Sequence, residues 1–382
     1  MERAAADGGL SPAIYRAGDI EYRVATRADE PVVRDILARI STGGDVRLSF
    51  RREPDAFGAS FGARSGDFIL ARDRRDGADV GICERVVRDC FVNGGVVALP
   101  YLAGLRVVPG FRHRLPVLRG GFEAVRRLLG TAGDVRWSFT SIMSDNAVAR
   151  RVLGANLANM PRYEPASEFS TFALPAGGKA PRSDTVGIGA RDDELPGISA
   201  LLLAAEARAQ FASVWTAESL RRYAASGWLR AADYLVVRRA GRIRSCAALW
   251  DQSAQRQVIV AGYSRWLARG RPFINAAARL AGLPRLPAPG QPLRCAYLSH
   301  VAIDTGAAGD LADLLAAARV RARERGFDVV LTGGASAGAL ADVVRAAPRG
   351  REYRSTLYVV RWPDDPAAAL DGRPVAPELA LL

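Results

Sequence analysis

The chain has 382 residues, of which 49% are hydrophobic, and a formal charge of +13 at pH 7. This length exceeds that of one ordinary hydrophobic core, so we expect two or three domains. No window approaches the ~18 uninterrupted apolar residues of a membrane-spanning helix. Residues 1–20 lack the apolar stretch of a secretion signal. We therefore expect a cytoplasmic protein without a membrane span.

The positive charge is carried almost entirely by arginine, because Lys179 is the only lysine. Surface arginine attracts phosphates and carboxylates. The charge is thus equally compatible with a solvated basic surface and with an acidic partner or a polyanionic cofactor.

Histidine and cysteine are scarce. The histidines are His113 and His300, and the cysteines lie in apolar, strand-like segments without C-x-x-C spacing: Cys83, Cys90, Cys246 and Cys295. This pattern is typical of buried thiols rather than of disulfides or a metal site. We therefore expect no metal.

The predicted elements occur twice along the chain, which indicates an internal repeat. A strand, an Arg-x-Asp-Glu helix start and an apolar helix over 22–40 return over 186–205. The acidic pair suits a helix N-terminus, where it meets the positive end of the dipole. Alternating strands that begin on Asp follow at 67–72 and 233–238.

The next matching segments are "YLAGLRV" (101–107) and "YLSHVAI" (297–303). Each leads through a loop into an amphipathic helix, then a strand, a short helix and a final strand. The second copy carries an insert at about 264–292, with a predicted helix and a proline-rich return loop. Because long insertions near the open end of a sheet commonly act as lids, we predict that this one covers a substrate.

Residues 174–185 have the Gly, Pro and polar content of a linker. We therefore predict two domains, 1–178 and 179–382, with the insert in the second. Each is an α/β unit with a mixed, mostly antiparallel twisted sheet flanked by helices.

This order of elements, with the V-x-P-x-x-R pattern of Val107, Pro109 and Arg112, resembles the GNAT (GCN5-related) superfamily of N-acyltransferases. The resemblance covers most of the chain and implies a tandem pair of GNAT-like domains. It also implies that the loop after the fourth strand binds the pyrophosphate of coenzyme A at a helix N-terminus. The implied donor is acetyl-CoA or a longer acyl-CoA, and the acceptor is a primary amine on a small molecule or peptide.

The resemblance places the cofactor on one strand end, the loop and helix after it, and a later helix start: Leu105, Arg106, Val107, Arg112, His113, Arg114, Leu115, Val117, Leu118 and Asn146. At the positions where the family pattern has two glycines, this chain has Leu115 and Val117, with Pro116 between them. Side chains there narrow the approach of a phosphate to the backbone, and Pro116 donates no amide. We therefore expect arginine side chains to hold much of the pyrophosphate.

The later helix resembles the family's N-x-x-A pattern, with Asn146 and Ala149 in place. The tyrosine that often protonates the leaving thiolate falls on Leu153. In the second half the loop has no arginine, and Asp304 and Asp310 add negative charge that would repel a pyrophosphate. We predict that this second loop is the poorer cofactor site, while either half stays open as the catalytic one.

Two residues of the first half are candidates for catalysis. Glu84 interrupts an apolar strand and is a candidate base, although a solvent-facing side chain gives the same pattern. Tyr101 is a candidate for orienting the acceptor, or a core aromatic residue. In the second half His300 and Tyr297 would line the equivalent cleft with Trp250, or serve only in packing.

Three rival functions stay open. The donor could be an acyl carrier protein, whose acidic surface suits the basic chain. It could also be an aminoacyl-tRNA, as in the tandem-domain Fem transferases of cell-wall synthesis, where positive charge also fits. The third rival is a binding module without catalytic activity.

Overall fold

The computed structural model describes residues 12–39, 45–111, 114–131, 133–182, 186–281, 284–304, 307–347, 350–366 and 368–382. The elements of the first half are β1 (Ala13–Ala17), β2 (Ile20–Val24), α1 (Glu30–Arg39), β3 (Val46–Arg51), β4 (Ser65–Asp73), β5 (Asp79–Val92), β6 (Gly95–Val107), α2 (Leu115–Leu128), β7 (Ser138–Met143), α3 (Ala147–Leu153) and β8 (Arg162–Pro175). Those of the second half are β9 (Val186–Ile188), α4 (Leu195–Glu206), α5 (Ala217–Ala225), β10 (Tyr234–Arg239), β11 (Arg242–Trp250), β12 (Gln257–Tyr263), α6 (Arg265–Leu280), β13 (Cys295–Ile303), α7 (Gly309–Glu324), β14 (Val329–Ala335), α8 (Ala339–Arg345) and β15 (Arg351–Arg361).

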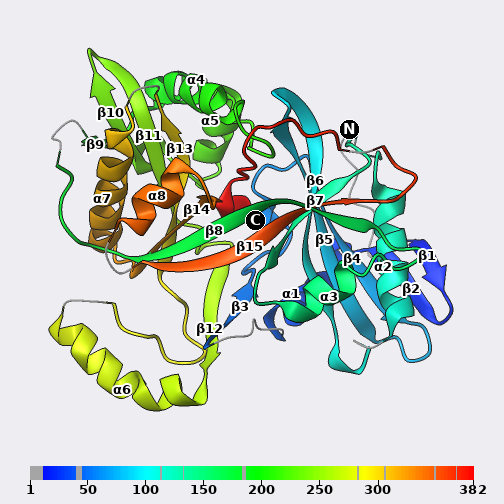
Figure 1. Cartoon of the computed structure of the whole chain (residues 1–382). Coiled ribbons are helices and arrows are strands. Elements are labelled where there is room, and N and C mark those ends of the chain that lie inside the picture. The colour runs from blue at the N-terminus through cyan, green and yellow to red at the C-terminus, as the bar shows by residue number, and fades with distance from the viewer. Residues whose placement is uncertain are drawn as a thin grey trace.

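One 13-stranded sheet runs through both halves (Figure 1), in the order β1-β2-β4-β5-β6-β7-β15-β8-β14-β13-β11-β10-β9. Within it, the pairs β6–β7 and β13–β14 are parallel and the other neighbours are antiparallel. The predicted α/β fold with a mixed, mostly antiparallel sheet is therefore confirmed.

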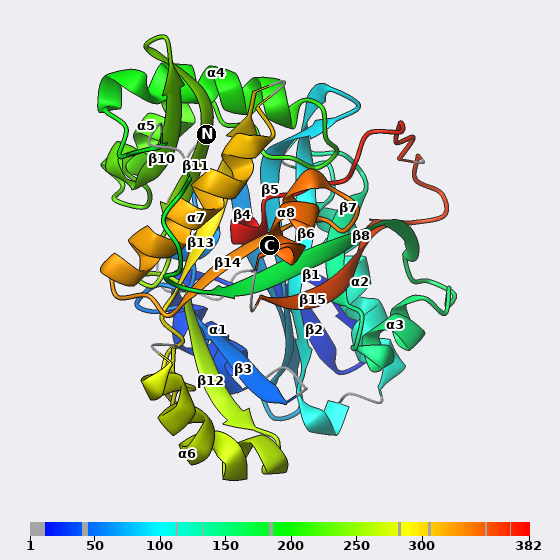
Figure 2. The same cartoon turned by 60° about the vertical axis from the view of Figure 1, so that its left-hand side comes forward.

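The last strands of the two halves are exchanged. β8 ends the first half, but it pairs with β14 and β15 of the second. β15 in turn pairs with β7 of the first half. Figures 1 and 2 show β8 and β15 side by side where the two halves meet. The predicted boundary at residue 178 follows β8 directly and stays a prediction, whereas the sheet itself is continuous across it.

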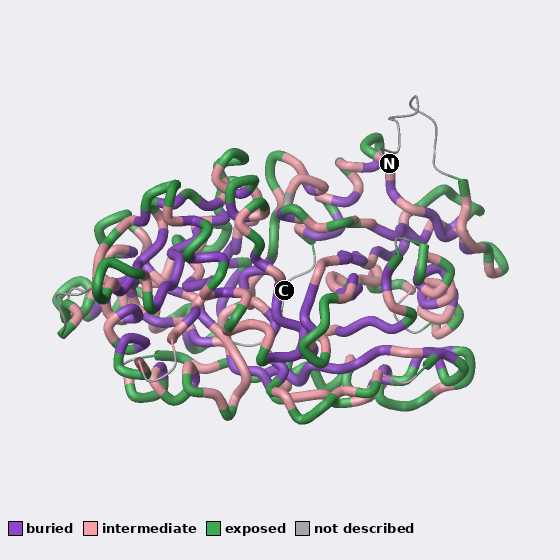
Figure 3. The backbone as a smooth tube through the Cα atoms, turned by 90° about the horizontal axis from the view of Figure 1, so that it is seen from above, coloured by how far each residue is buried: buried purple, intermediate pink, exposed green. Residues whose placement is uncertain are grey.

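Helices cover both faces of the sheet. Successive side chains of a strand point to opposite faces, so neighbouring residues pack against different helices. In β10, Tyr234 and Val236 pack in the cluster of α4 and α5, whereas Leu235 and Val237 pack in that of α7 and α8. The first half follows the same rule: Ile69 packs with α2, and its neighbours in β4 pack with α1. Figure 3 shows the buried backbone running through the middle of both halves.

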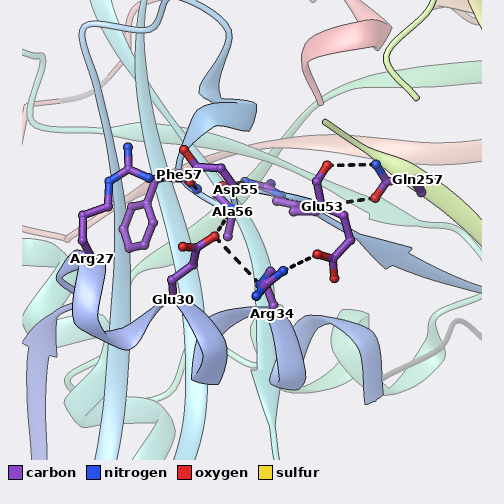
Figure 4. Close-up of polar contacts among 9 residues, drawn as sticks. Arg27, Glu30, Arg34, Glu53, Asp55, Ala56, Phe57 and Gln257 are labelled. Carbon is purple, nitrogen blue, oxygen red and sulfur yellow. Dashed lines mark hydrogen bonds and ion pairs between the residues drawn. The ribbon is translucent and has the colours of Figure 1, made fainter. Parts of the chain in front are cut away.

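A second, two-stranded sheet of β3 and β12 joins the halves. At its end Gln257 Nε2 donates to the Glu53 carbonyl (3.0 Å), and the Glu53 N–H donates to Gln257 Oε1 (3.1 Å). The Glu53 carboxylate also pairs with Arg34 of α1, whose Nε lies 3.8 Å from Glu30 (Figure 4). These contacts fix the segment that contains Arg52 over the first half.

The predicted insert contains α6, which continues from β12 at the edge of the molecule (Figures 1 and 2). Leu267 of α6 packs with Tyr263 and partly buried residues of β3. The outer side chains are uncovered, with Phe273 79% exposed. The outer apolar side chains of α6 therefore remain largely exposed within the described chain, and the role of the insert as a lid stays a prediction.

All four cysteines are free thiols, with Cys90 and Cys246 buried and the other two half-buried. In the described ranges, no helix has the length and apolarity needed to cross a bilayer. Over the same ranges, no three His, Cys, Asp or Glu side chains gather as a metal site would require.

Candidate active site

The repeat creates two equivalent openings in the sheet, one in each half. β6 pairs with β7 only at Tyr101 and Phe139, and β13 pairs with β14 up to Tyr297 and Leu331. Beyond the two tyrosines the parallel strands separate. In the part of the chain that the structure describes, the residues of β6 after Tyr101 pair with no strand on the edge that faces β7. The same holds for the residues of β13 after Tyr297 on the edge that faces β14.

Matching threonines stand beside the two openings. Thr140 Oγ1 donates to the Leu102 carbonyl at 2.7 Å, and Thr332 Oγ1 donates to the Leu298 carbonyl at 3.3 Å. Each accepting residue directly follows one of the two tyrosines. The two halves therefore share local geometry as well as element order.

Each opening also contains a β-bulge. The register with the preceding antiparallel strand shifts at the bulge in both β6 and β13. Gly104 (φ 61°) and His300 (φ 51°) occupy the matching positions, both in the left-handed region. Glycine adopts this conformation at little cost, whereas a β-carbon makes it unfavourable for histidine. The second bulge therefore persists only because surrounding contacts hold His300 in place.

The second opening is filled by the chain itself. The His300 N–H donates to Glu378 Oε2 at 3.0 Å, and Glu378 Oε1 accepts from the Ala380 N–H at 3.2 Å. The His300 ring is fully buried, with its centre 3.9 Å from that of Trp215. Burial lowers the pKa of His300 to about 3, so the imidazole is neutral at physiological pH.

Among the described residues, none fills the first opening in this way. The position of a β-carbon on Gly104 is bordered by Glu84 at 3.9 Å and Leu37 at 4.0 Å. The next residue, Leu105, is 40% exposed. The described residues therefore cover the bulge of β6 less than that of β13, because Gly104 is half-buried and His300 is fully buried.

The start of α2 offers few free backbone amides for a phosphate. The Val117 N–H donates to the Arg114 carbonyl at 2.9 Å, and Pro116 has no N–H to donate. The Val117 side chain is buried, and its carbonyl accepts from Tyr22 Oη at 2.8 Å. Leu115 and Leu118 also pack against this core. Contacts from Leu115 and Leu118 to a cofactor would therefore come from the backbone, whereas both backbone groups of Val117 already have partners.

Arginine side chains near the first opening have unused donors. Arg106 Nε on β6 and Arg119 Nε on α2 are buried, and neither has a hydrogen-bond partner in the described ranges. Burial lowers the pKa of Arg106. Arg114 is exposed, with its guanidinium 4.5 Å from the ring centre of Phe111. These donors fit a phosphate-bearing ligand, since buried cations need a counter-charge.

The cofactor roles of Arg112, His113 and Asn146, like those of the other predicted cofactor residues, stay predictions. Arg112 and His113 lie outside the described residues. Asn146 caps α3, where its Oδ1 accepts from the Ala149 N–H at 3.1 Å. Arg119 was not predicted from the sequence, although it follows Leu115 by about one helical turn and so lies near the same helix start.

The acids of the second loop are paired with arginines. Asp310 binds Arg239 through two bonds of 2.8 and 2.5 Å, which hold the pKa of its carboxyl below the usual value. Asp304 pairs with Arg244. The expected repulsion of a pyrophosphate is therefore largely offset. What distinguishes the second opening is its filling by His300 and Glu378.

Glu84 is buried, so the solvent-facing interpretation is wrong. Its side chain is 4% exposed and accepts two bonds from Arg52, of 2.7 and 2.5 Å. Burial alone would raise the pKa of Glu84, but Arg52, assisted by Arg256 and Arg88, lowers it below the usual value. A carboxylate held in this way is a weak proton acceptor. Its catalytic role stays a prediction.

Tyr101 lines a small pocket between the two halves. Its ring centre lies 4.8 Å from that of Phe139, and burial raises its pKa, so the hydroxyl keeps its proton. The pocket is mainly apolar, with a few polar groups: Arg88, Cys90, Leu99, Tyr101, Phe139, Phe211, Ser213, Pro377, Glu378, Leu381 and Leu382. Burial also raises the pKa of Glu378. The pocket thus combines a half-buried carboxyl group of raised pKa with a phenol that keeps its proton.

The remaining second-half candidates serve in packing. Trp250 is fully buried in the same cluster as Trp215 and Tyr234, and Tyr297 packs against that cluster. His300 contacts three of these rings.

Neither a protein-family model nor a curated protein sequence matches the chain. Solved structures do match it. The N-myristoyltransferase of Saccharomyces cerevisiae with bound myristoyl-CoA aligns over 98% of this chain and 92% of its own, with a TM-score of 0.61 and 13% identity. A GCN5-related N-acetyltransferase from Sphaerobacter thermophilus aligns over 92% and 99%, with a TM-score of 0.54 and 13% identity.

The chain has a GNAT-type acyltransferase fold. A GCN5-related glucosamine N-acetyltransferase region of a fungal multi-domain GH3 β-N-acetylglucosaminidase is similar too, with a TM-score of 0.58 and 14% identity, over 93% of this chain and 39% of that one. The resemblance predicted from the sequence is therefore confirmed at the level of the fold.

Proposed function

We propose that the chain is an N-acyltransferase that takes its acyl group from acyl-CoA bound at the first opening. One observation carries this proposal: the second of the two equivalent openings is filled by His300 and Glu378. In the first, only Glu84 and Leu37 of the described residues come within 4 Å of the position that a β-carbon on Gly104 would take. An N-myristoyltransferase of similar fold has been solved with myristoyl-CoA, which supports a thioester of coenzyme A as the donor.

The residues around the first opening fit the parts of acyl-CoA. Within the described residues, the backbone groups of β6 after Tyr101 form no strand pairing on the edge that faces β7. These groups are suited to hydrogen bonds with the amides of the pantetheine arm. Arg106, Arg114 and Arg119 supply donors for the phosphates. The thioester would then lie towards the pocket lined by Tyr101.

The acceptor amine would enter the pocket shared by the two halves. Its nitrogen forms a bond to the acyl carbon as the carbon–sulfur bond breaks, and the amine loses one proton. Glu378 is the carboxyl group in this pocket, and its raised pKa favours proton uptake. Tyr101, which keeps its own proton, is placed to donate a hydrogen bond to the reacting groups. The departing thiolate takes up a proton to give free coenzyme A.

Calorimetric titration tests the donor site. Wild type is expected to bind coenzyme A and acyl-CoA, and an Arg106→Gln/Arg119→Gln variant should bind at least about tenfold more weakly, since hydrogen bonds to charged groups contribute about 1.5–3 kcal/mol. A control variant, Arg242→Gln/Arg323→Gln, removes two exposed arginines of the second half and should bind as wild type does. An Arg112→Ala/Arg114→Ala variant tests the loop in the same way.

Two outcomes would contradict the proposal. If wild type binds no coenzyme A thioester, acyl-CoA is not the donor. If the Arg106→Gln/Arg119→Gln variant binds as tightly as its control, the cofactor is not held at the first opening.

A further inference from the structure

Helix α6 has an orientation fixed by its inner face. Leu267 and Ala278 are buried on that face. Arg271 Nη1 donates to the Pro287 carbonyl at 3.0 Å. Asn275 exchanges two hydrogen bonds with the backbone of Leu286, of 2.7 and 3.1 Å. The return loop therefore holds the helix in place, and the opposite face points away from the protein.

That outer face carries a line of large apolar side chains. Trp266, Phe273 and Leu280 are 61%, 79% and 91% exposed. They follow one another at intervals of seven residues, so they lie on one side of the helix, about 10 Å apart. Trp266 Nε1 donates to Asp45 at 2.9 Å, which satisfies its polar atom and leaves the ring uncovered. Contiguous apolar exposure of this kind marks an interaction surface.

The same segment is strongly basic. Residues 264–292 contain five arginines and no acidic residue: Arg265, Arg269, Arg271, Arg279 and Arg285. In the ranges that the structure describes, none of the five forms an ion pair. Elsewhere arginines regularly pair with acids, as Arg239 does with Asp310. The charge of this segment is thus free to attract an anionic surface.

We propose that α6 is a membrane-surface anchor that lies flat in the headgroup region of a bilayer containing anionic phospholipids. An amphipathic helix with Trp, Phe and Leu on one side and flanking arginines has the composition of such interfacial helices. A straight apolar line on a protruding helix fits a planar surface, and Figures 1 and 2 both show α6 at the edge of the molecule. Each arginine near the surface adds to the attraction for anionic lipid. This inference does not depend on the proposed acyl transfer.

Co-sedimentation with vesicles tests the anchor. Wild type should sediment with vesicles of phosphatidylcholine containing phosphatidylglycerol, and much less with phosphatidylcholine alone. A Trp266→Ser/Phe273→Ser/Leu280→Ser variant should bind at least about tenfold more weakly, because three inserted side chains are lost. The matched control, Val96→Ser/Val148→Ser/Ile188→Ser, removes three other exposed apolar side chains (53%, 66% and 53% exposed) and should bind as wild type does.

A second variant tests the proposal independently, in case the first one misfolds. Arg265→Gln/Arg269→Gln/Arg279→Gln retains the apolar line and should lose the preference for phosphatidylglycerol, and salt should have the same effect on wild type. Failure of wild type to sediment with anionic vesicles would overturn the proposal, as would equal binding of the apolar variant and its control. Capture of an acidic acyl carrier protein through the apolar line, with no vesicle binding, would assign the surface to a protein partner instead.

Discussion

The two openings of the sheet share a tyrosine, a threonine and a β-bulge, yet they differ in what fills them. In the first, Gly104 leaves space beside the bulge. In the second, His300 occupies the matching position, and Glu378 accepts its backbone N–H. The comparison shows that the same backbone arrangement can be left partly uncovered in one half and be filled by the chain itself in the other. The difference between the two openings comes from the His300 side chain and from the segment that contains Glu378.

Giving the first opening the side chain of the second should have the largest effect. A Gly104→His variant is expected to lose acyl-CoA affinity by about 100-fold, equivalent to about 2.7 kcal/mol, because the imidazole would occupy the ligand's space. A β-carbon at φ 61° should also lower the free energy of unfolding by about 1–2 kcal/mol. Titration of acyl-CoA and urea unfolding measure the two effects.

The matched control is Gly77→His, at φ 73° with no atom within 4 Å of the position that a β-carbon would take. It should show a similar loss of stability and wild-type affinity. If Gly104→His binds acyl-CoA as tightly as Gly77→His does, the first opening is not the donor site.

The stability of the protein should be sensitive to pH through Glu206, at the end of α4. Burial, assisted by the nearby Glu378, raises the pKa of Glu206 to about 8, above its ordinary value of 4.5. The folded state therefore holds this proton more tightly, so its stabilising effect is complete below about pH 4.5 and is lost as pH rises through 8. Glu206→Gln removes the ionisation. Relative to the variant, wild type should lose roughly 4 kcal/mol between pH 5 and pH 9, since each pKa unit corresponds to about 1.4 kcal/mol.

Urea unfolding of both proteins at pH 5, 7 and 9 measures this difference. A Glu218→Gln variant, which changes an exposed glutamate in the first turn of α5, is the matched control and should parallel wild type. Parallel profiles for Glu206→Gln and wild type would show that Glu206 ionises freely in the folded protein.

The smallest effect is expected in the second loop. Asp304 pairs with Arg244, and both side chains are partly exposed (26% and 48%). Asp304→Asn should therefore change stability by less than about 1 kcal/mol. It should also create no acyl-CoA binding in a Gly104→His background, because His300 still fills the second opening. Recovery of binding in that double variant would show that charge, rather than filling, had excluded the cofactor.

Much of the fold could be predicted from the sequence because its elements have clear periodicity and recur in order. The segments 101–107 and 297–303 both form strands, and their aligned positions match down to the two bulges. The exchange of β8 and β15 could not be foreseen. Alternation specifies which face of a strand is buried, but it does not specify which neighbour the strand pairs with.

The candidate site was less accessible to sequence reasoning, since its residues come from distant segments. Glu378 reaches the pocket of Tyr101 from an irregular stretch near residue 382 that has no periodic pattern. Glu84 looked like an exposed charge because its partner, Arg52, lies on a separate segment. Such pairings depend on tertiary contacts, which no local pattern records.

The exchanged strands have a consequence for biosynthesis. While the ribosome is still making the second half, β7 has no partner on one edge, because its partner there, β15 (351–361), has not yet been synthesised. β8 must wait for both of its neighbours. An unpaired strand edge invites association with other chains, and pairings between remote segments form slowly. The nascent protein therefore completes its sheet only after residues 351–361 have been made, and until then it should depend most on chaperones.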